Sequence, residues 1–237
     1  MDDFDIFDPR RPTAKRPLLG MTVLVVEDSR YACEALRLKC LRSGARIRRA
    51  DSLTAATRHL KVYRPSVAII DFGLPDGPGE DLIRDLAQTT PRLGVLLGMS
   101  GNDAMEERAM DAGADGFLHK PIASLAVFQE TILSAAPSEH WQLGPRVVAD
   151  ETVEPDISAY RDDISFVSEL LEERQDGPTL DYVAQFLSGV ARSARDSQLA
   201  EAAGVLSQTP PGEGRRRAQA SHILQMVQDR LQNQLAI

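Results

Sequence analysis

The sequence has little cysteine and no long apolar run, and each shortage excludes a class of protein. Only two of the 237 residues are cysteine, Cys33 and Cys40. They lie seven apart in a predicted helix, which favours packing in a core over a disulfide framework or a cysteine metal site. No apolar run approaches the roughly 18 residues that span a bilayer, and residues 1–16 lack the apolar centre of a signal peptide. The sequence therefore predicts a globular cytoplasmic protein without a membrane segment.

Positive charge is also scarce. The chain has 27 Lys and Arg against 35 Asp and Glu, a formal net charge of −8. Residues 140–237 contain nine Lys and Arg against fifteen Asp and Glu, and the three arginines at 215–217 are the one basic cluster there. A nucleic-acid-binding module neutralises phosphates with Lys and Arg. The charge balance therefore argues against nucleic acid as a partner.

Four apolar runs each end in polar groups. They are residues 22–26 followed by Glu27 and Asp28, residues 67–70 followed by Asp71, residues 95–99 followed by Ser100, and residues 116–119 followed by Lys120. Each run has the apolar content of a buried strand and precedes a loop and a helical pattern. With the alternating residues 46–50 they make five βα units, and such units form a parallel sheet whose strand ends share one edge. The sequence predicts a doubly wound α/β domain with these polar groups gathered at that edge.

This set of residues, in this order at these strand ends, resembles the response-regulator receiver domain of two-component signalling. The resemblance covers about residues 20–136. It implies a flavodoxin-like sheet with strand order 2-1-3-4-5. It also implies transfer of a phosphoryl group from a phosphohistidine to an aspartate, in which catalysis is mostly positioning and charge neutralisation.

The resemblance assigns the acidic residues to phosphoryl acceptance and metal binding. Asp71 would be the phosphoacceptor. Glu27, Asp28 and Asp71, together with the backbone carbonyl of Gly73, would bind Mg²⁺, which prefers hard oxygen ligands. The same residues would repel one another strongly without a cation. Mg²⁺ is the one cofactor that we expect.

The resemblance also assigns the contacts of the phosphoryl group and the response to it. Lys120 would pair with Asp71 and then with the phosphoryl oxygens, and the peptide bond between Lys120 and Pro121 would be cis. Ser100 would donate a hydrogen bond to a phosphoryl oxygen. As Ser100 moves toward the phosphoryl group, Phe117 would turn inward and complete the switch. A permanently buried Phe117 is the alternative.

The remaining sequence suggests three further segments beside the receiver domain at 20–136. Residues 1–19, rich in proline and charge, predict a flexible arm. Residues 137–155 are interrupted by proline and glycine, contain the single tryptophan, Trp141, and predict a linker. Residues 156–237 show only helical periodicity, which predicts a small all-α domain of three or four amphipathic helices.

The helical domain has no motif that identifies its function. His222, in His222-Ile223-Leu224-Gln225-Met226, faintly resembles the phosphotransfer motif His-x-Leu-Lys-Gly. Methionine replaces the glycine of that motif, and too few residues follow to complete a four-helix bundle. A degenerate phosphotransfer-like bundle and a dimerisation module that pairs its last helix with a second copy both remain open.

We therefore expect a response regulator that is phosphorylated on Asp71 by a sensor histidine kinase or a histidine-phosphotransfer protein. Its output would be a protein–protein contact through the helical domain, in a homodimer with a downstream protein target. We expect no enzymatic activity beyond its own phosphorylation and dephosphorylation. Two alternatives stay open, a transcriptional regulator with an unrecognised DNA-binding domain and a phosphorelay protein that uses His222.

Overall fold

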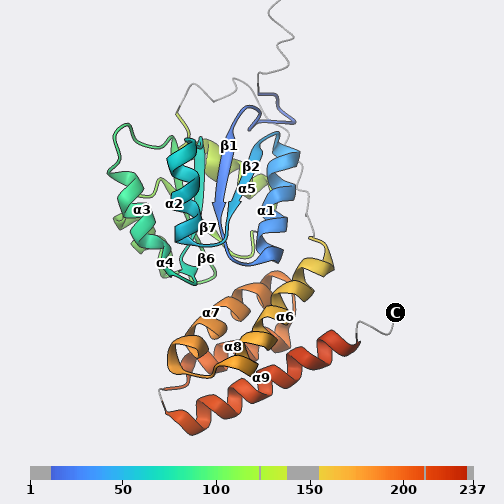
Figure 1. Ribbon diagram of the computed structural model, residues 1–237. Coiled ribbons are helices and arrows are strands. Elements are labelled where there is room, and N and C mark those ends of the chain that lie inside the picture. Colours follow the sequence, from blue (N-terminus) through green and yellow to red (C-terminus); the bar gives the residue numbers. More distant parts are fainter. Residues whose placement is uncertain (1–11, 123, 138–154, 211, 234–237) are drawn as a thin grey trace, which may run out of the picture.

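A computed structural model describes residues 12–122, 124–137, 155–210 and 212–233. The described chain forms an α/β domain and a helical bundle that lies against one end of the sheet (Figure 1). In the part that the structure describes, no helix is long and apolar enough to cross a membrane.

The α/β domain is built on a five-stranded parallel sheet in the order β2-β1-β3-β6-β7. Its strands are β1 (Thr22–Val26), β2 (Arg46–Ala50), β3 (Val67–Asp71), β6 (Val95–Ser100) and β7 (Gly116–His119). This arrangement confirms the predicted strand order 2-1-3-4-5. Every residue of β3 and β6 is buried, which explains why these strands are continuous apolar runs rather than alternating ones. A short hairpin that the sequence did not predict, β4 (Gly73–Leu74) with β5 (Gly77–Pro78), follows β3.

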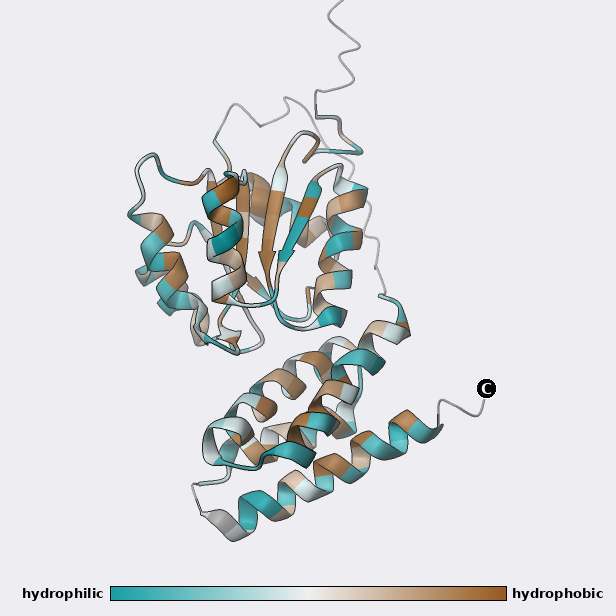
Figure 2. Cartoon of the chain, viewed as in Figure 1, coloured by the Kyte–Doolittle hydropathy of each residue, from teal (hydrophilic) through white to brown (hydrophobic). Residues whose placement is uncertain are grey.

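Five helices cover the two faces of the sheet, and each face has its own apolar core. The helices are α1 (Arg30–Ser43), α2 (Leu53–Val62), α3 (Gly79–Ala87), α4 (Met105–Asp111) and α5 (Leu125–Ala135). Leu36 of α1 and Phe128 of α5 pack on one face, and Ala56, Ile83 and Ala109 of α2, α3 and α4 pack on the other. The brown strands between these helices show the apolar interior (Figure 2).

The helix ends follow from local sequence. The Ser29 hydroxyl accepts a hydrogen bond from the Ala32 amide and begins α1, and Gly44, with φ of 85°, ends it. Cys33 and Cys40 are free and buried in the first core, as expected from their spacing.

The predicted boundary of the N-terminal arm is wrong. Residues 1–11 lie outside the described residues, but Leu18 is fully buried in the core with α1 and α5. Its backbone amide donates to the Ser43 carbonyl, at 2.9 Å. The last residues of the arm predicted over 1–19 therefore belong to the α/β domain, because an apolar side chain there fills the core beside the end of α1. Most of the linker predicted over 137–155, including Trp141, lies outside the described residues.

The second domain, as far as the structure describes it, is a four-helix bundle. Its helices are α6 (Ile157–Glu173), α7 (Gly177–Ser193), α8 (Ser197–Gln208) and α9 (Glu213–Asn233). Asp156, Asp176 and Asp196 accept backbone hydrogen bonds at the starts of the first three helices. The apolar stripes seen in the sequence bury one another in a core that includes Val167, Leu187 and further residues of all four helices. The sequence predicted three or four helices here, and the described residues form four.

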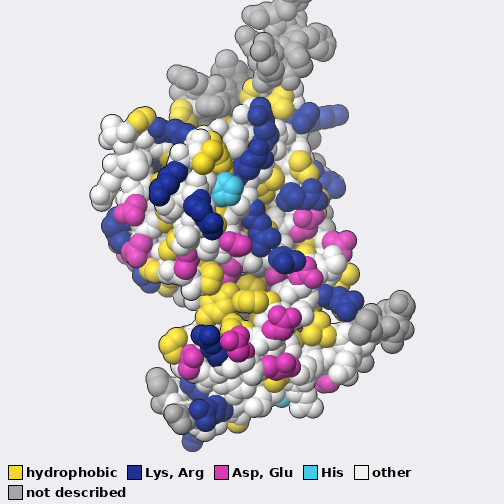
Figure 3. All heavy atoms as spheres, in the orientation of Figure 1, with side chains coloured by type: hydrophobic (Ala, Val, Ile, Leu, Met, Phe, Trp, Pro, Cys, Tyr) yellow, Lys and Arg dark blue, Asp and Glu magenta, His cyan; other side chains and the backbone are white. Residues whose placement is uncertain are grey.

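The bundle contacts the α/β domain through α6 and α7. These helices lie beside α1 and β4, whereas α9 lies on the far side of the bundle (Figure 1). The ring of Tyr31, on α1, packs edge-on against the ring of Tyr160, on α6, with centroids 6.0 Å apart. A band of apolar side chains is visible at the junction of the two domains (Figure 3). The bundle therefore covers the carboxyl edge of the sheet.

Candidate functional site

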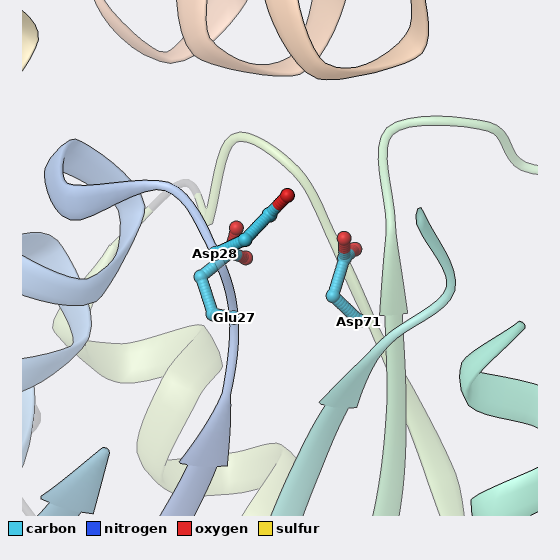
Figure 4. Close-up of side chains that lie close together, drawn as sticks. All are labelled: Glu27, Asp28 and Asp71. Carbon is cyan, nitrogen blue, oxygen red and sulfur yellow. The ribbon is translucent and has the colours of Figure 1, made fainter. Parts of the chain in front are cut away.

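The carboxyl edge of the sheet gathers the polar residues that follow its strands. Glu27 and Asp28 come directly after β1, Asp71 is the last residue of β3, Ser100 is the last residue of β6, and Lys120 comes directly after β7. The carboxylates of the first three point toward one another, with helices of the bundle above them (Figure 4). Parallel strands bring these positions together although 93 residues separate the first from the last.

Glu27, Asp28 and Asp71 form an acidic cluster. One carboxylate oxygen of each lies within 4.8 Å of the others. Burial, together with repulsion from Asp71 and Asp28, raises the pKa of Glu27 to about 8. Burial also raises the pKa of Asp28 to about 6, against the lowering effect of a hydrogen bond from Tyr182. Three mutually repelling, largely buried carboxylates are a donor set that fits a hard divalent cation.

Lys120 is the cation within this cluster. Its Nζ atom lies 2.6 Å from Glu27 Oε2 and 2.8 Å from Asp71 Oδ1. Burial lowers the pKa of this lysine, but the two carboxylates together raise it by a larger amount, so its pKa lies above the ordinary value. The peptide bond between Lys120 and Pro121 is cis, as the resemblance implied. The lysine is therefore charged and directed at the carboxylate of Asp71.

Gly73 and Ser100 lie beside the same carboxylate, and Phe117 lies in the adjoining apolar core. The Gly73 amide donates to Asp71 Oδ2 at 3.2 Å. Ser100 is 6% exposed, and its hydroxyl accepts from the Asn102 amide. Phe117 is also buried, with its ring edge-on to Phe72 at a centroid distance of 6.1 Å. Phe117 thus occupies the inward position here, and its movement with Ser100 stays a prediction, as does metal binding by the Gly73 carbonyl.

The bundle adds side chains that the sequence alone did not connect to the site. Tyr182, on α7, donates its hydroxyl to Asp28 Oδ2 at 2.6 Å. Arg192, near the end of α7, donates to the Gly101 carbonyl at 3.0 Å, next to Ser100. Both contacts join residues more than 90 positions apart, and only docking of the two domains shows them.

Asp163, on α6, binds the start of α1. Its carboxylate accepts from the Ser29 hydroxyl at 2.7 Å, from the Arg30 amide at 2.8 Å and from the Tyr31 amide at 3.0 Å. The first amides of a helix lack partners within the helix, and the helix dipole favours a negative charge there. Although burial raises the pKa of Asp163, these three donors favour its ionised form. The carboxylate is thus a second N-terminal cap, supplied by the other domain.

A cavity of about 760 Å³ lies between the domains at this edge. Asp71, Ser100 and Lys120 line it from the α/β domain, and Gln185 and Gly189 of α7 line it from the bundle. The Asp71 carboxylate therefore faces a space that a small molecule can enter, lined on its far side by α7.

His222 is not brought to this site. It is an exposed residue of α9, the helix on the far side of the bundle from the sheet (Figure 1). Arg216, in the basic cluster of the same helix, is 6% exposed and forms an ion pair with Asp181 of α7. One arginine of that cluster thus serves the bundle itself rather than a surface for an acidic partner.

The sheet order and the polar residues at its carboxyl edge are those expected of a receiver domain. The sequence pattern of the family described as "response regulator receiver domain" matches residues 23–131. This stretch is a response regulator receiver domain, which confirms the family that the strand-end residues predicted. The match ends before the helical bundle and leaves it unassigned.

Known proteins resemble the same part of the chain. The KDP operon transcriptional regulatory protein KdpE of Escherichia coli is 35% identical over 99 residues, which are 42% of this chain and 44% of that protein. The virulence transcriptional regulatory protein PhoP of Salmonella typhimurium is 32% identical over 103 residues, 43% of this chain and 46% of that protein. The chain thus matches less than half the length of these curated relatives.

Solved structures match over a similar share of the chain. A response regulator from Chloroflexus aurantiacus is 28% identical with a TM-score of 0.44, covering 48% of this chain and 98% of that one. The receiver domain of sensor histidine kinase PA1611 from Pseudomonas aeruginosa, solved with a magnesium ion in its active site cleft, is 21% identical with a TM-score of 0.44. It covers 48% of this chain and 96% of its own.

Proposed function

We propose that this chain is a two-component response regulator that accepts a phosphoryl group on Asp71 from a phosphohistidine of a sensor histidine kinase or a histidine-phosphotransfer protein. The observation that carries the proposal is the pairing of Asp71 with Lys120 at 2.8 Å inside the cluster with Glu27 and Asp28. A structural carboxylate has no need of two further buried acids beside it, because they raise one another's free energy.

The reaction would replace one bond to phosphorus by another. An Asp71 carboxylate oxygen attacks the phosphorus, the bond from phosphorus to the histidine nitrogen breaks, and the freed imidazole takes a proton from water. Glu27, Asp28 and Asp71, with the Gly73 carbonyl, would hold Mg²⁺, which would supply positive charge beside the phosphoryl oxygens. The ammonium group of Lys120 would exchange its contact with the carboxylates for an ion pair with a phosphoryl oxygen.

The response would begin at Ser100. A phosphoryl oxygen near Asp71 offers the Ser100 hydroxyl a charged acceptor, which is a stronger partner than a neutral one. Phe117 already lies inward, so the change on phosphorylation would concern the loop after Ser100, where Arg192 of the bundle donates to Gly101. We expect the signal to reach the bundle through this contact.

The output would be a protein–protein contact made by the bundle in the cytoplasm, either with a second copy or with a downstream protein. The acidic composition of residues 140–237 supports a protein partner. We expect no enzymatic activity beyond phosphorylation and dephosphorylation of the chain itself. The second candidate is a transcriptional regulator, because KdpE and PhoP carry that description. Gel shifts against genomic fragments separate the two, and we expect no shift.

The test is phosphorylation of the full chain by acetyl phosphate. With Mg²⁺, we expect one phosphoryl group on the wild-type chain, located on Asp71 by mass spectrometry, and loss of the signal when a chelator removes the metal. Asp71→Asn should take up none. Asp111→Asn is the matched control, since Asp111 is exposed on α4 and should leave labelling unchanged. Equal labelling of the Asp71→Asn chain would overturn the proposal.

A further inference from the structure

The bundle occupies the side from which a phosphodonor has to approach. Helix α7 lies over the carboxyl edge of the sheet, with Tyr182 bound to Asp28 and Arg192 bound to Gly101. Between these two contacts, the side chain of Gln185 lies against Gly73. A Cβ atom built on Gly73 would be 2.3 Å from Gln185 Nε2. The Gly73 amide in turn donates to Asp71.

A histidine donor needs that same space. For transfer, the acceptor oxygen must lie within about 3–3.5 Å of the phosphorus, which is bonded to the donor nitrogen. The helix that carries the histidine must then lie no more than a side chain and a phosphoryl group away from Asp71. Helix α7 already lies at this place, across the cavity that Asp71 lines. An external donor and α7 therefore cannot occupy the edge together.

The sequence of α7 carries a second, independent sign of the same relation. Residues 185–189 read Gln-Phe-Leu-Ser-Gly. They match the phosphotransfer motif His-x-Leu-Lys-Gly at its leucine and its glycine, and the residue at the histidine position is Gln185. Leu187 is fully buried in the bundle core. Gly189 lines the cavity, and nothing lies within 4 Å of a Cβ built on it, so the glycine keeps space open beside Gln185.

We propose that the bundle docks on its own receiver domain as a histidine-bearing donor would, with Gln185 in place of the histidine. The surface made by Asp28, the start of α1, Gly73 and Gly101 is then the phosphodonor docking surface, and the fitting partner is a helix that presents an imidazole. The carboxamide of Gln185 has no nucleophilic nitrogen, so the bundle transfers nothing. It is a tethered competitor that a phosphodonor must displace. This inference rests on the proposed function of Asp71.

The interface is built to be displaced rather than permanent. Its hydrogen bonds include those of Asp163, Tyr182 and Arg192, polar groups that water can satisfy when the domains part. Apolar contacts, such as that between the rings of Tyr31 and Tyr160, accompany them, and an interface of this mixed character between domains of one chain allows relative motion. The bundle also has its own apolar core, so separation leaves its helices packed on one another.

The test gives the bundle the missing histidine. In the full chain with Gln185→His, acetyl phosphate and Mg²⁺ should first phosphorylate Asp71. The imidazole nitrogen at position 185 then attacks that phosphorus, the bond to the Asp71 oxygen breaks, the carboxylate is restored, and a phosphohistidine forms. We expect mass spectrometry to find an acid-labile, base-stable phosphoryl group at position 185, and we expect its complete loss when Asp71→Asn is added.

Two controls are present in the same bundle. Gln225→His places an imidazole at an exposed glutamine of α9, and the native His222 is an exposed histidine of the same helix. Neither should carry phosphate, because α9 lies on the far side of the bundle (Figure 1). Gln185 is itself exposed, so its substitution should leave the thermal unfolding transition of the bundle in place.

The outcomes separate the two proposals. Phosphate on position 185 that depends on Asp71 supports both. Phosphate on Asp71 but not on position 185, in a chain with a normal unfolding transition, overturns the docking proposal and leaves the proposed function in place. Equal phosphate at positions 185, 222 and 225 also overturns it, because reaction would then be independent of docking. No phosphate on Asp71 of the wild-type chain overturns both.

Discussion

The two domains of this chain differ in how far their functional residues can be identified from the sequence. In the receiver domain each functional residue stands next to the strand that positions it, so that Asp71 follows β3 and Lys120 follows β7. In the bundle the residues that reach the site, Tyr182 and Arg192, lie inside a helix whose apolar stripe looks like that of any bundle helix. A site at strand ends can therefore be inferred from spacing, whereas a site made by docking cannot.

The contrast between the two domains would fail most clearly if the apolar cores of the receiver domain and the bundle unfolded together. Leu187 is fully buried between helices of the bundle. We expect Leu187→Ala to lower the free energy of unfolding of the bundle by about 2–5 kcal/mol. Calorimetry should show the transition of the bundle at a lower temperature, while Asp71 still accepts phosphate. Gln225→Ala, at an exposed position of α9, is the control. A single transition that moves as a whole would show that the domains unfold as one unit.

The contact between the domains can be weakened without touching either core. Asp163→Asn removes the charge that accepts three hydrogen bonds from Ser29, Arg30 and Tyr31. We expect docking to weaken by about 1–3 kcal/mol, because buried donors lose a charged acceptor. Hydrogen exchange at the Arg30 and Tyr31 amides should become faster.

The neighbouring aspartate provides the matched control for that experiment. Asp162 pairs with the Arg30 side chain at 2.7 Å, but both side chains are more than half exposed. An exposed ion pair contributes about 0–1 kcal/mol. Asp162→Asn should therefore leave exchange at the start of α1 nearly unchanged. Equal acceleration in both variants would show that Asp163 has no special role in docking.

A smaller effect is expected at the acidic cluster. Tyr182→Phe frees Asp28 Oδ2 from a hydrogen bond of 2.6 Å. We expect Mg²⁺ to bind up to about tenfold more tightly, since a hydrogen bond to a charged group contributes about 1.5–3 kcal/mol, part of which water restores. Titration calorimetry measures this. Tyr160→Phe, which removes a tyrosine hydroxyl bound to Asp196 inside the bundle, should leave the affinity unchanged. Weaker Mg²⁺ binding in Tyr182→Phe would contradict the expectation.

The smallest expected effect concerns pH. Burial raises the pKa of Asp196. Hydrogen bonds from Arg230, Tyr160 and the Leu199 amide together lower it by a larger amount, so the pKa lies below the ordinary value. A lowered pKa in the folded state adds stability above the unfolded-state pKa, and this stability is lost as the pH falls through the folded-state value. The bundle should therefore lose stability below about pH 4. Asp196→Asn should flatten this acid limb, as measured by urea unfolding between pH 3 and pH 7, roughly the range over which Asp titrates. An unchanged slope would contradict it.

Most of the receiver domain could be predicted because its signals are local. Ser29 and Gly44 mark the ends of α1, and the apolar runs of β3 and β6 reveal strands buried on both faces. The predicted arm includes Leu18, which is buried, because nothing in the sequence distinguishes a buried Leu18 from an exposed one. A histidine made His222 the candidate for a phosphotransfer-like pattern, whereas the residue that lines the pocket is Gln185 of α7.

The sequence by itself determined the family, the sheet order and the residues of the acidic pocket, because parallel βα units bring consecutive strand ends to one edge. Only the tertiary structure decided what lies above that edge. Asp163 reaches the start of α1, and Tyr182 reaches Asp28, across more than 130 residues. The physical reason is that docking depends on the shapes and charges of two finished surfaces. The apolar periodicity that predicts the helices of the bundle does not specify these surfaces.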